Sequence, residues 1–340
     1  MSNMFYILEG NNGATYILNI RSLQDIKQSL NFYKARTLKQ KIQKNVLIIY
    51  LMVLKVFGFK LQSLDDIKVY LSSLSDVAID YGLDTNCSVL VSPTRDKVIV
   101  HHHDEYFEKF AFAKSYANVK KESEVYELLN TKHKHFKVSK FYDKVDTSHY
   151  CSFKLSNVSN EVMNDVDMTL ALVEFFSITL QTNVSFFSYI DTLVKECREN
   201  KPIGTLLKKY KTLYADESIS SGLVHRDFKP WNIKYEDGLL IFDFEEAITD
   251  GLPLEDMLNF RVDPIIRYQD TKVVYEHIFD HKSVEEYKRY LDLLGIKIDF
   301  VVFLNLYIIN RVVFWEKAKD SKASQCYMML FEYINQKKLY

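Results

Sequence analysis

The sequence predicts an α+β fold, in which an antiparallel sheet is followed by a mainly helical region. Short alternating strands separated by turns occupy residues 88–155. From residue 162 onward, apolar residues recur at the spacing of helices. We therefore divide the 340 residues into an N-terminal extension over 1–84, a sheet lobe with its hinge over 85–158 and a helical lobe over 159–340.

Composition and charge exclude several classes of protein. The net charge of −1 is unlike that of a nucleic-acid-binding protein. The cysteines are far apart and form no zinc or disulfide pattern, which predicts reduced thiols in the cytoplasm. They are Cys87, Cys151, Cys197 and Cys326. The chain starts without a signal-peptide pattern, and its early apolar run 46–54 is far shorter than the roughly 20 residues that cross a bilayer.

The N-terminal extension should contain a β-hairpin followed by helices. Residues 4–8 and 15–20 have the composition of strands, and the glycines and asparagines at 10–13 favour a turn between them. Ser22 and Ser63 each precede a helical pattern and are predicted N-caps.

A basic segment, Lys34–Lys60, has two interpretations. It contains seven basic residues and no acidic one, namely Lys34, Arg36, Lys39, Lys41, Lys44, Lys55 and Lys60. Basic residues beside an apolar helix are typical of segments that bind an anionic membrane surface. A helix packed on the core would instead bury Val46, Ile49, Met52, Val53 and Phe57, which have the required spacing. We expect packing, with only weak, salt-sensitive association with the inner face of a membrane.

Five strands are expected in the sheet lobe, over residues 88–91, 97–101, 106–114, 136–142 and 150–155. His101, His102 and His103 follow one another at the end of the second strand. Consecutive strand residues point to opposite faces, so these three cannot hold one metal ion without distorting the strand. We expect a hairpin tip with solvated imidazoles.

Two neighbouring motifs carry the chemistry. In the run Leu223–Ile233, Asp227 is followed five residues later by Asn232, and a short apolar strand then leads into Asp243. Phosphoryl transfer needs a carboxylate that accepts the proton of the attacking hydroxyl, and oxygen ligands for Mg2+. Asp227 suits the base, while Asn232 and Asp243 suit the metal.

The pattern H-x-D-F-x-P-W-N-I, an apolar strand into D-F-E and then Gly251–Asp256 resembles the aminoglycoside phosphotransferase/choline kinase-like superfamily. It is most similar to members from bacterial polysaccharide and surface-glycan gene clusters. The resemblance implies a bilobal protein-kinase-like fold that uses ATP and Mg2+ to phosphorylate a hydroxyl group. Arg226 and Lys229 depart from this family toward protein kinases, and Asp243-Phe244-Glu245 replaces D-F-G.

The resemblance also implies nucleotide-binding residues. Lys114, at the end of the third strand, is the counterpart of the lysine that contacts the ATP phosphates and is held by a helix glutamate. Glu122 is favoured over Glu124 for that glutamate, because it shares a helix face with apolar residues. Ser92 and Thr94 occupy the turn that would cover the phosphates. The backbone of residues 152–159 would bind adenine.

Other roles follow from the same resemblance. Lys229 either reaches the transferred phosphoryl group or is a solvated loop lysine. Asp256 is expected to orient the catalytic loop, paired with Arg226, and His225 is expected to brace the loop. Glu245 is a candidate for binding metal or substrate.

The acceptor is the least defined part of the prediction. The family members that the sequence resembles favour a sugar hydroxyl in surface-glycan synthesis, a reaction on a small-molecule or glycan acceptor. A choline or aminoglycoside kinase, a protein kinase and a nucleotide-binding pseudokinase scaffold are the alternatives. Because pseudokinases usually lose a residue of the set Lys114, Asp227, Asn232 and Asp243, the presence of all four favours an enzyme.

Overall fold

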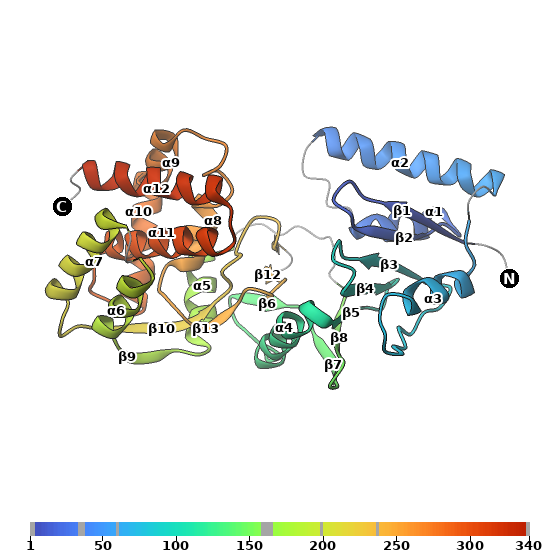
Figure 1. Ribbon diagram of the computed structural model, residues 1–340, viewed down its shortest axis with the longest axis horizontal. Helices are drawn as coiled ribbons and strands as arrows, with labels where there is room; N and C mark the ends of the chain where they lie inside the picture. Colours follow the sequence, from blue (N-terminus) through green and yellow to red (C-terminus); the bar gives the residue numbers. More distant parts are fainter. Residues whose placement is uncertain are drawn as a thin grey trace. The chain divides into compact units, whose positions relative to one another are not determined.

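The computed structural model describes residues 4–32, 38–58, 61–157, 166–197, 200–235 and 238–337. The chain forms two compact units, of which one consists of residues 1–130 and 139–159 and the other of residues 131–138 and 160–340. The first unit contains an antiparallel sheet and the second is mainly helical, which confirms the α+β class (Figure 1).

A seven-stranded antiparallel sheet, in the order β1-β2-β3-β4-β5-β8-β7, is the framework of the first unit. Its strands are β1 (Phe5–Glu9), β2 (Thr15–Asn19), β3 (Cys87–Val91), β4 (Lys97–His102), β5 (Tyr106–Phe112), β7 (Phe141–Asp146) and β8 (Tyr150–Ser156). The predicted N-terminal hairpin is confirmed. Since β2 also pairs with β3, the boundary predicted at residue 85 crosses a continuous sheet.

Helices cover this sheet. They are α1 (Leu23–Ser29), η1 (Leu30–Phe32), α2 (Leu38–Phe57), α3 (Leu64–Ser72), η2 (Ala113–Ser115) and α4 (Tyr116–Leu128). Ser22 and Ser63 cap α1 and α3 as predicted, by accepting a backbone hydrogen bond from the first turn.

The packing face of α2 differs from the prediction. Leu51 and Leu54 are buried against β2 and α1, whereas the residues predicted to face the core are exposed. Those exposed residues are Val46, Ile49, Met52, Val53 and Phe57. The helix is apolar on two faces, so spacing alone could not identify the buried one. Lys34, Arg36 and Lys60 of the predicted basic segment lie outside the described residues.

The three consecutive histidines are buried, so the prediction of solvated imidazoles is wrong. Asp25 of α1 approaches His103 with its Oδ1 3.4 Å from Nδ1, and Ser88 Oγ lies 3.2 Å from Nε2. Burial lowers the pKa of each imidazole, that of His101 to about 3. His101 and His103 therefore belong to the core beside α1 and η1, whereas His102 lies on the other face of the sheet, where its ring stacks on Tyr106 at 4.3 Å between centroids.

The second unit contains two small sheets. In one, β6 (Phe136–Val138) pairs in parallel with β12 (Leu239–Ile241), which pairs with β11 (Ile233–Tyr235). In the other, β10 (Ser218–Val224) lies between β9 (Gln181–Ser185) and β13 (Ile248–Gly251). One prediction is corrected here, since the strand expected over 136–142 is divided between the units as β6 and β7.

The remaining elements are helices. They are α5 (Met168–Ser177), α6 (Phe186–Glu196), α7 (Lys201–Leu213), α8 (Glu255–Val262), α9 (Thr271–Ile278), α10 (His281–Leu293), α11 (Phe300–Lys317) and α12 (Ser321–Gln336). Asp299 caps α11, which is largely buried. Among the described helices, none has the length and apolar character needed to cross a membrane.

Candidate functional site

The loop after β10 is held by a buried carboxylate. Asp256 of α8 accepts hydrogen bonds from the backbone N–H groups of His225, at 2.7 Å, and Arg226, at 2.9 Å. This orients the loop as predicted, although the Arg226 side chain pairs with Glu255, with Nε 3.3 Å from Oε1. Burial raises the pKa of Asp256 to about 7, and the two backbone donors oppose that shift. Arg226 has a φ of +61°, so the loop turns sharply just before Asp227.

His225 is a structural part of the loop. It is fully buried, and its Nε2 donates to the carbonyl oxygen of Phe242 at 2.9 Å. Its Nδ1 accepts from the backbone N–H of Asp227 at 3.3 Å. Burial lowers the pKa of His225, so the imidazole is neutral and both ring nitrogens are used. The predicted bracing role fits these contacts.

The structure brings Asp227, Asn232 and Lys229 together. Asn232 Nδ2 donates to the carbonyl oxygen of Asp227 at 3.0 Å and to its carboxylate Oδ2 at 2.7 Å. Lys229 Nζ forms ion pairs with Asp227 Oδ1 and, at 2.7 Å, with Asp263 Oδ2. The Lys229 side chain is only 14% exposed, which contradicts a solvated loop lysine. Both of these hydrogen bonds use the amide nitrogen of Asn232 and neither uses its amide oxygen.

Asp263, the C-cap residue of α8, anchors Lys229 and was not identified from the sequence. Arg311 Nη2 binds its two carboxylate oxygens at 3.2 and 3.0 Å, and the Tyr327 hydroxyl donates to Oδ1. Burial disfavours the charged carboxylate, but Arg311 and Lys229 outweigh it and hold the pKa of Asp263 below its usual value. The signal in the sequence was Arg311 itself, because a charge inside an apolar helix requires a buried partner.

Replacing Asp263 by Asn should lower the free energy of unfolding by about 3–5 kcal/mol at pH 7, because the buried Arg311 and Lys229 lose a carboxylate partner. The folded-state pKa of Asp263 is lowered, so its stabilisation is present above the unfolded pKa of about 3.9. This stabilisation is lost as the pH falls through the folded-state pKa of Asp263. The free energies of unfolding of the variant and the wild type should then become equal. Chemical denaturation at several pH values measures this difference.

Asp191→Asn is the matched control, since Asp191 pairs with Lys195 and Lys211 at the surface. It should leave the free energy of unfolding nearly unchanged, because exposed ion pairs contribute little to stability. Equal effects of the two substitutions would contradict the anchoring role of Asp263.

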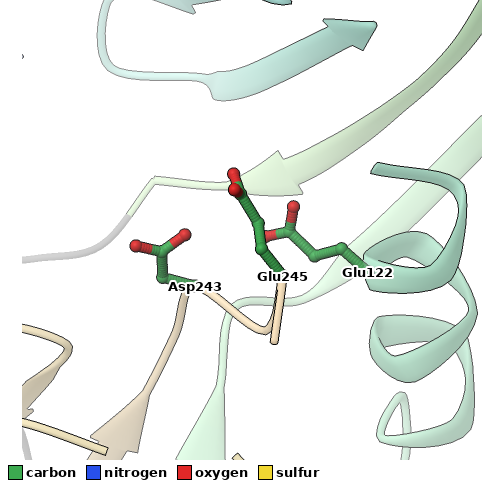
Figure 2. Close-up of side chains that lie close together, drawn as sticks. All are labelled: Glu122, Asp243 and Glu245. Atoms are coloured by element: carbon green, nitrogen blue, oxygen red, sulfur yellow. The ribbon is translucent and has the colours of Figure 1, made fainter. Parts of the chain in front are cut away.

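Asp243 and Glu245 follow β12. Figure 2 shows their side chains extending from this loop, and Phe244 between them is buried, with its ring stacked on Phe175 at 5.9 Å between centroids. The β11–β12 pairing continues through the backbone N–H of Phe242, which donates to the carbonyl oxygen of Asn232 at 3.2 Å. This hairpin brings the predicted metal ligands Asn232 and Asp243 to the same end of the small sheet.

A cavity of about 220 Å3 adjoins these residues within the second unit. Its lining combines carboxylates, basic side chains and two aromatic rings, namely Arg226, Asp227, Lys229, Asp243, Glu245, Glu246, Arg311, Phe314 and Trp315. A small molecule in this cavity would lie directly beside the Asp227 carboxylate.

In the first unit, the ion pair predicted for Lys114 is made by Lys109. Lys109 Nζ on β5 lies 2.9 and 2.6 Å from the two carboxylate oxygens of Glu122, which projects from α4 (Figure 2). Lys114 is exposed in η2, because β5 ends at Phe112. The pairing of Lys114 with Glu122 is therefore wrong. The choice of Glu122 over Glu124 is supported, since Glu122 is 1% exposed and Glu124 is exposed.

Ser92 and Thr94 form the predicted turn between β3 and β4, but their hydroxyls bond within it. The two hydroxyl oxygens are 3.0 Å apart, Thr94 donates to the Asp96 carboxylate, and Ser92 Oγ accepts from the backbone N–H of Lys97 at 3.2 Å. A carboxylate in the turn disfavours an adjacent phosphate. These contacts indicate that the hydroxyls shape the turn. Of the predicted adenine-binding segment, Val158 and Ser159 lie outside the described residues.

No protein-family model matches the chain, and no curated protein matches its sequence. The solved structures to which it is similar include wild-type aminoglycoside 2'-phosphotransferase-IIIa in a GDP complex, with 13% identity over 80% of this chain and 98% of that chain, and a TM-score of 0.41. The macrolide 2'-phosphotransferase MphH from Brachybacterium faecium is 12% identical over 77% of this chain and 95% of that chain, with a TM-score of 0.41. The aminoglycoside phosphotransferase APH(3'')-Id from Streptomyces rimosus is 14% identical over 78% of this chain and 97% of that chain, with a TM-score of 0.37.

Proposed function

We propose that the chain is an ATP- and Mg2+-dependent phosphotransferase that transfers the γ-phosphoryl group to a hydroxyl of a small molecule, a sugar of bacterial surface-glycan synthesis. The observation that carries this proposal is the hydrogen-bonded group formed by Asp227, Asn232 and Lys229, with Asp243 following the adjacent strand. Such an arrangement supplies a base, a cation and oxygen ligands in one place, which is what phosphoryl transfer requires.

Each side chain has a role consistent with its contacts. Asp227 would orient the acceptor hydroxyl and take its proton, while Lys229, held by Asp263, would neutralise charge on the transferred group. Carboxylate and amide oxygens suit a hard cation, so Asp243 and the Asn232 Oδ1 would hold Mg2+. An ion held there would supply positive charge that neutralises the nucleotide phosphates. We assign the phosphate-binding lysine to Lys109 instead of Lys114, because Glu122 holds it in place.

The cavity lining is mixed in charge. Its three basic side chains are already ion-paired, Arg226 with Glu255, and Lys229 and Arg311 with Asp263. Four carboxylates also line the cavity, so it offers no excess of positive charge to an acidic acceptor. A neutral sugar fits this lining, because Phe314 and Trp315 offer apolar surface to a ring face and the polar side chains offer hydrogen-bond partners to its hydroxyls.

Nucleotide-dependent thermal stabilisation and a transfer assay together test the proposed function. The melting temperature should rise with ATP only when Mg2+ is present, with GTP as a parallel arm that reports the purine preference. Radiolabelled γ-phosphate should then move to a member of a panel of sugars, amino alcohols and cell-envelope extracts. Stabilisation by nucleotide without transfer to any acceptor would favour a pseudokinase, and labelling of protein would favour a protein kinase.

Asp243→Ala should weaken Mg2+-dependent nucleotide binding by at least about tenfold, since even outer partners of metal ligands contribute 10- to 100-fold to metal affinity. Isothermal titration with ATP, with and without Mg2+, measures this loss. Asp250→Ala is the control, because Asp250 is an exposed carboxylate in the neighbouring β13. Wild-type affinity in Asp243→Ala would contradict the proposed metal ligand.

A further inference from the structure

The outward face of α2 is apolar and exposed. Eight large apolar residues of this one helix are between 42% and 80% exposed, namely Ile42, Val46, Ile49, Tyr50, Met52, Val53, Val56 and Phe57. The opposite face packs Leu51 and Leu54 against β2 and α1. Figure 1 shows α2 running along the side of β1, β2 and α1. An exposed apolar face of this size on a folded protein marks an interaction surface.

The exposed residues form one continuous stripe. Ile42, Val46, Ile49, Val53 and Val56 follow each other at intervals of four, three, four and three residues, so they lie along one side of the helix. Tyr50, Met52 and Phe57 widen the stripe on both flanks. A helix of 20 residues is about 30 Å long, which gives the stripe the length of the whole element.

The charge of α2 identifies the kind of partner. Between Leu38 and Phe57 the helix has Lys39, Lys41, Lys44 and Lys55 and no aspartate or glutamate. Lys39 and Lys41 lie at the edges of the stripe, whereas Lys44 and Lys55 lie on the opposite side of the helix, where Lys55 Nζ donates to the carbonyl oxygen of Arg21 at 2.6 Å. An anionic lipid surface is complementary to the apolar stripe and to the two lysines beside it.

We propose that α2 binds the surface of an anionic membrane and lies in its plane, with the apolar stripe inserted and Lys39 and Lys41 at the headgroups. The inserted apolar surface makes this association stronger and less dependent on salt than charge attraction alone, since only the charge contribution is screened. Phosphotransfer is not a premise of this proposal, which rests on α2 alone.

Co-sedimentation of the full chain with vesicles tests the proposal. Vesicles of phosphatidylcholine with 30% phosphatidylglycerol should bind the protein, and pure phosphatidylcholine vesicles should bind it about tenfold or more weakly. Raising the salt concentration should reduce binding to the anionic vesicles without abolishing it. Val56→Glu should reduce the partition coefficient by at least about tenfold, because it places a carboxylate within the apolar stripe.

Val69→Glu is the matched control, because Val69 is 71% exposed on α3 of the same unit. It should retain wild-type vesicle binding, and transfer to a soluble acceptor should be unchanged in both variants. Absence of binding to anionic vesicles at low salt would overturn the proposal, as would equal losses in the two variants. A lipid-free dimer in sedimentation velocity that Val56→Glu dissociates would also overturn it, by showing that a second copy covers the stripe.

Discussion

Asp227→Asn should lower the turnover number by roughly 10^2–10^4-fold, the usual contribution of a general base. The amide retains the shape of the carboxylate and an oxygen that can accept the Asn232 hydrogen bond, but it cannot take the proton of the acceptor hydroxyl. Lys229 keeps its ion pair with Asp263, so the loop should stay in place. Nucleotide affinity should therefore remain near the wild-type value. Single-turnover transfer of the γ-phosphate, together with nucleotide titration, measures the two properties separately.

Asp216→Asn, in an exposed turn of the same unit, provides the control for the loss of one carboxylate. Its turnover should match that of the wild type. A similar melting temperature of Asp227→Asn and the wild type would show that the loss is chemical. Wild-type turnover in Asp227→Asn would remove Asp227 from the role of base.

The contact between Asp227 and Asn232 in the loop after β10 could be predicted from sequence because it is local. Asp227 and Asn232 are five residues apart, and their hydrogen bond closes within the same loop. The strand before Asp243 is also short and apolar, so its existence and position could be predicted from the sequence alone. Spacing and residue type were therefore enough to place this part of the candidate site.

Partners that are distant in sequence could not be found in this way. Asp263 lies 48 residues from Arg311, and their ion pair exists only because α8 and α11 pack together. The exposed stripe of α2 was missed for a related reason. A helix with two apolar faces gives one periodic signal, and only the packing of Leu51 and Leu54 shows which face is buried.

The partner of Glu122 was predicted to be Lys114 instead of Lys109, because that prediction depended on where β5 ends. The sequence run Phe110–Lys114 continues the composition of β5, but Phe112 is the last residue of the strand and Ala113 has a φ of +49°. Since side chains alternate along a strand, Lys109 points to the face opposite to that of Phe110 and Phe112. α4 covers that face, so Lys109 is the lysine that meets Glu122.

Lys109→Met should consequently reduce kcat/KM by roughly 10^2–10^3-fold, the effect of removing one preorganised charge-stabilising donor. Lys114→Met, the same substitution five residues away on an exposed side chain, should leave it unchanged. Steady-state transfer of γ-phosphate to the best acceptor measures both. The kcat/KM of each variant is divided by that of the wild type with the same acceptor. The ratio therefore distinguishes the two lysines even when the acceptor is a poor one.

A loss of stability could also lower the activity of Lys109→Met, because Glu122 is buried and its carboxylate loses an ion pair of 2.6 Å. The double variant Lys109→Met/Glu122→Gln removes the unbalanced charge and should regain much of the lost stability. If Lys109 acts on the nucleotide phosphates, the double variant should remain as inactive as Lys109→Met while melting at a higher temperature. If the double variant recovered activity as well as stability, the ion pair between Lys109 and Glu122 would have only a structural role. A selective loss of activity in Lys114→Met would return the phosphate-binding role to that residue.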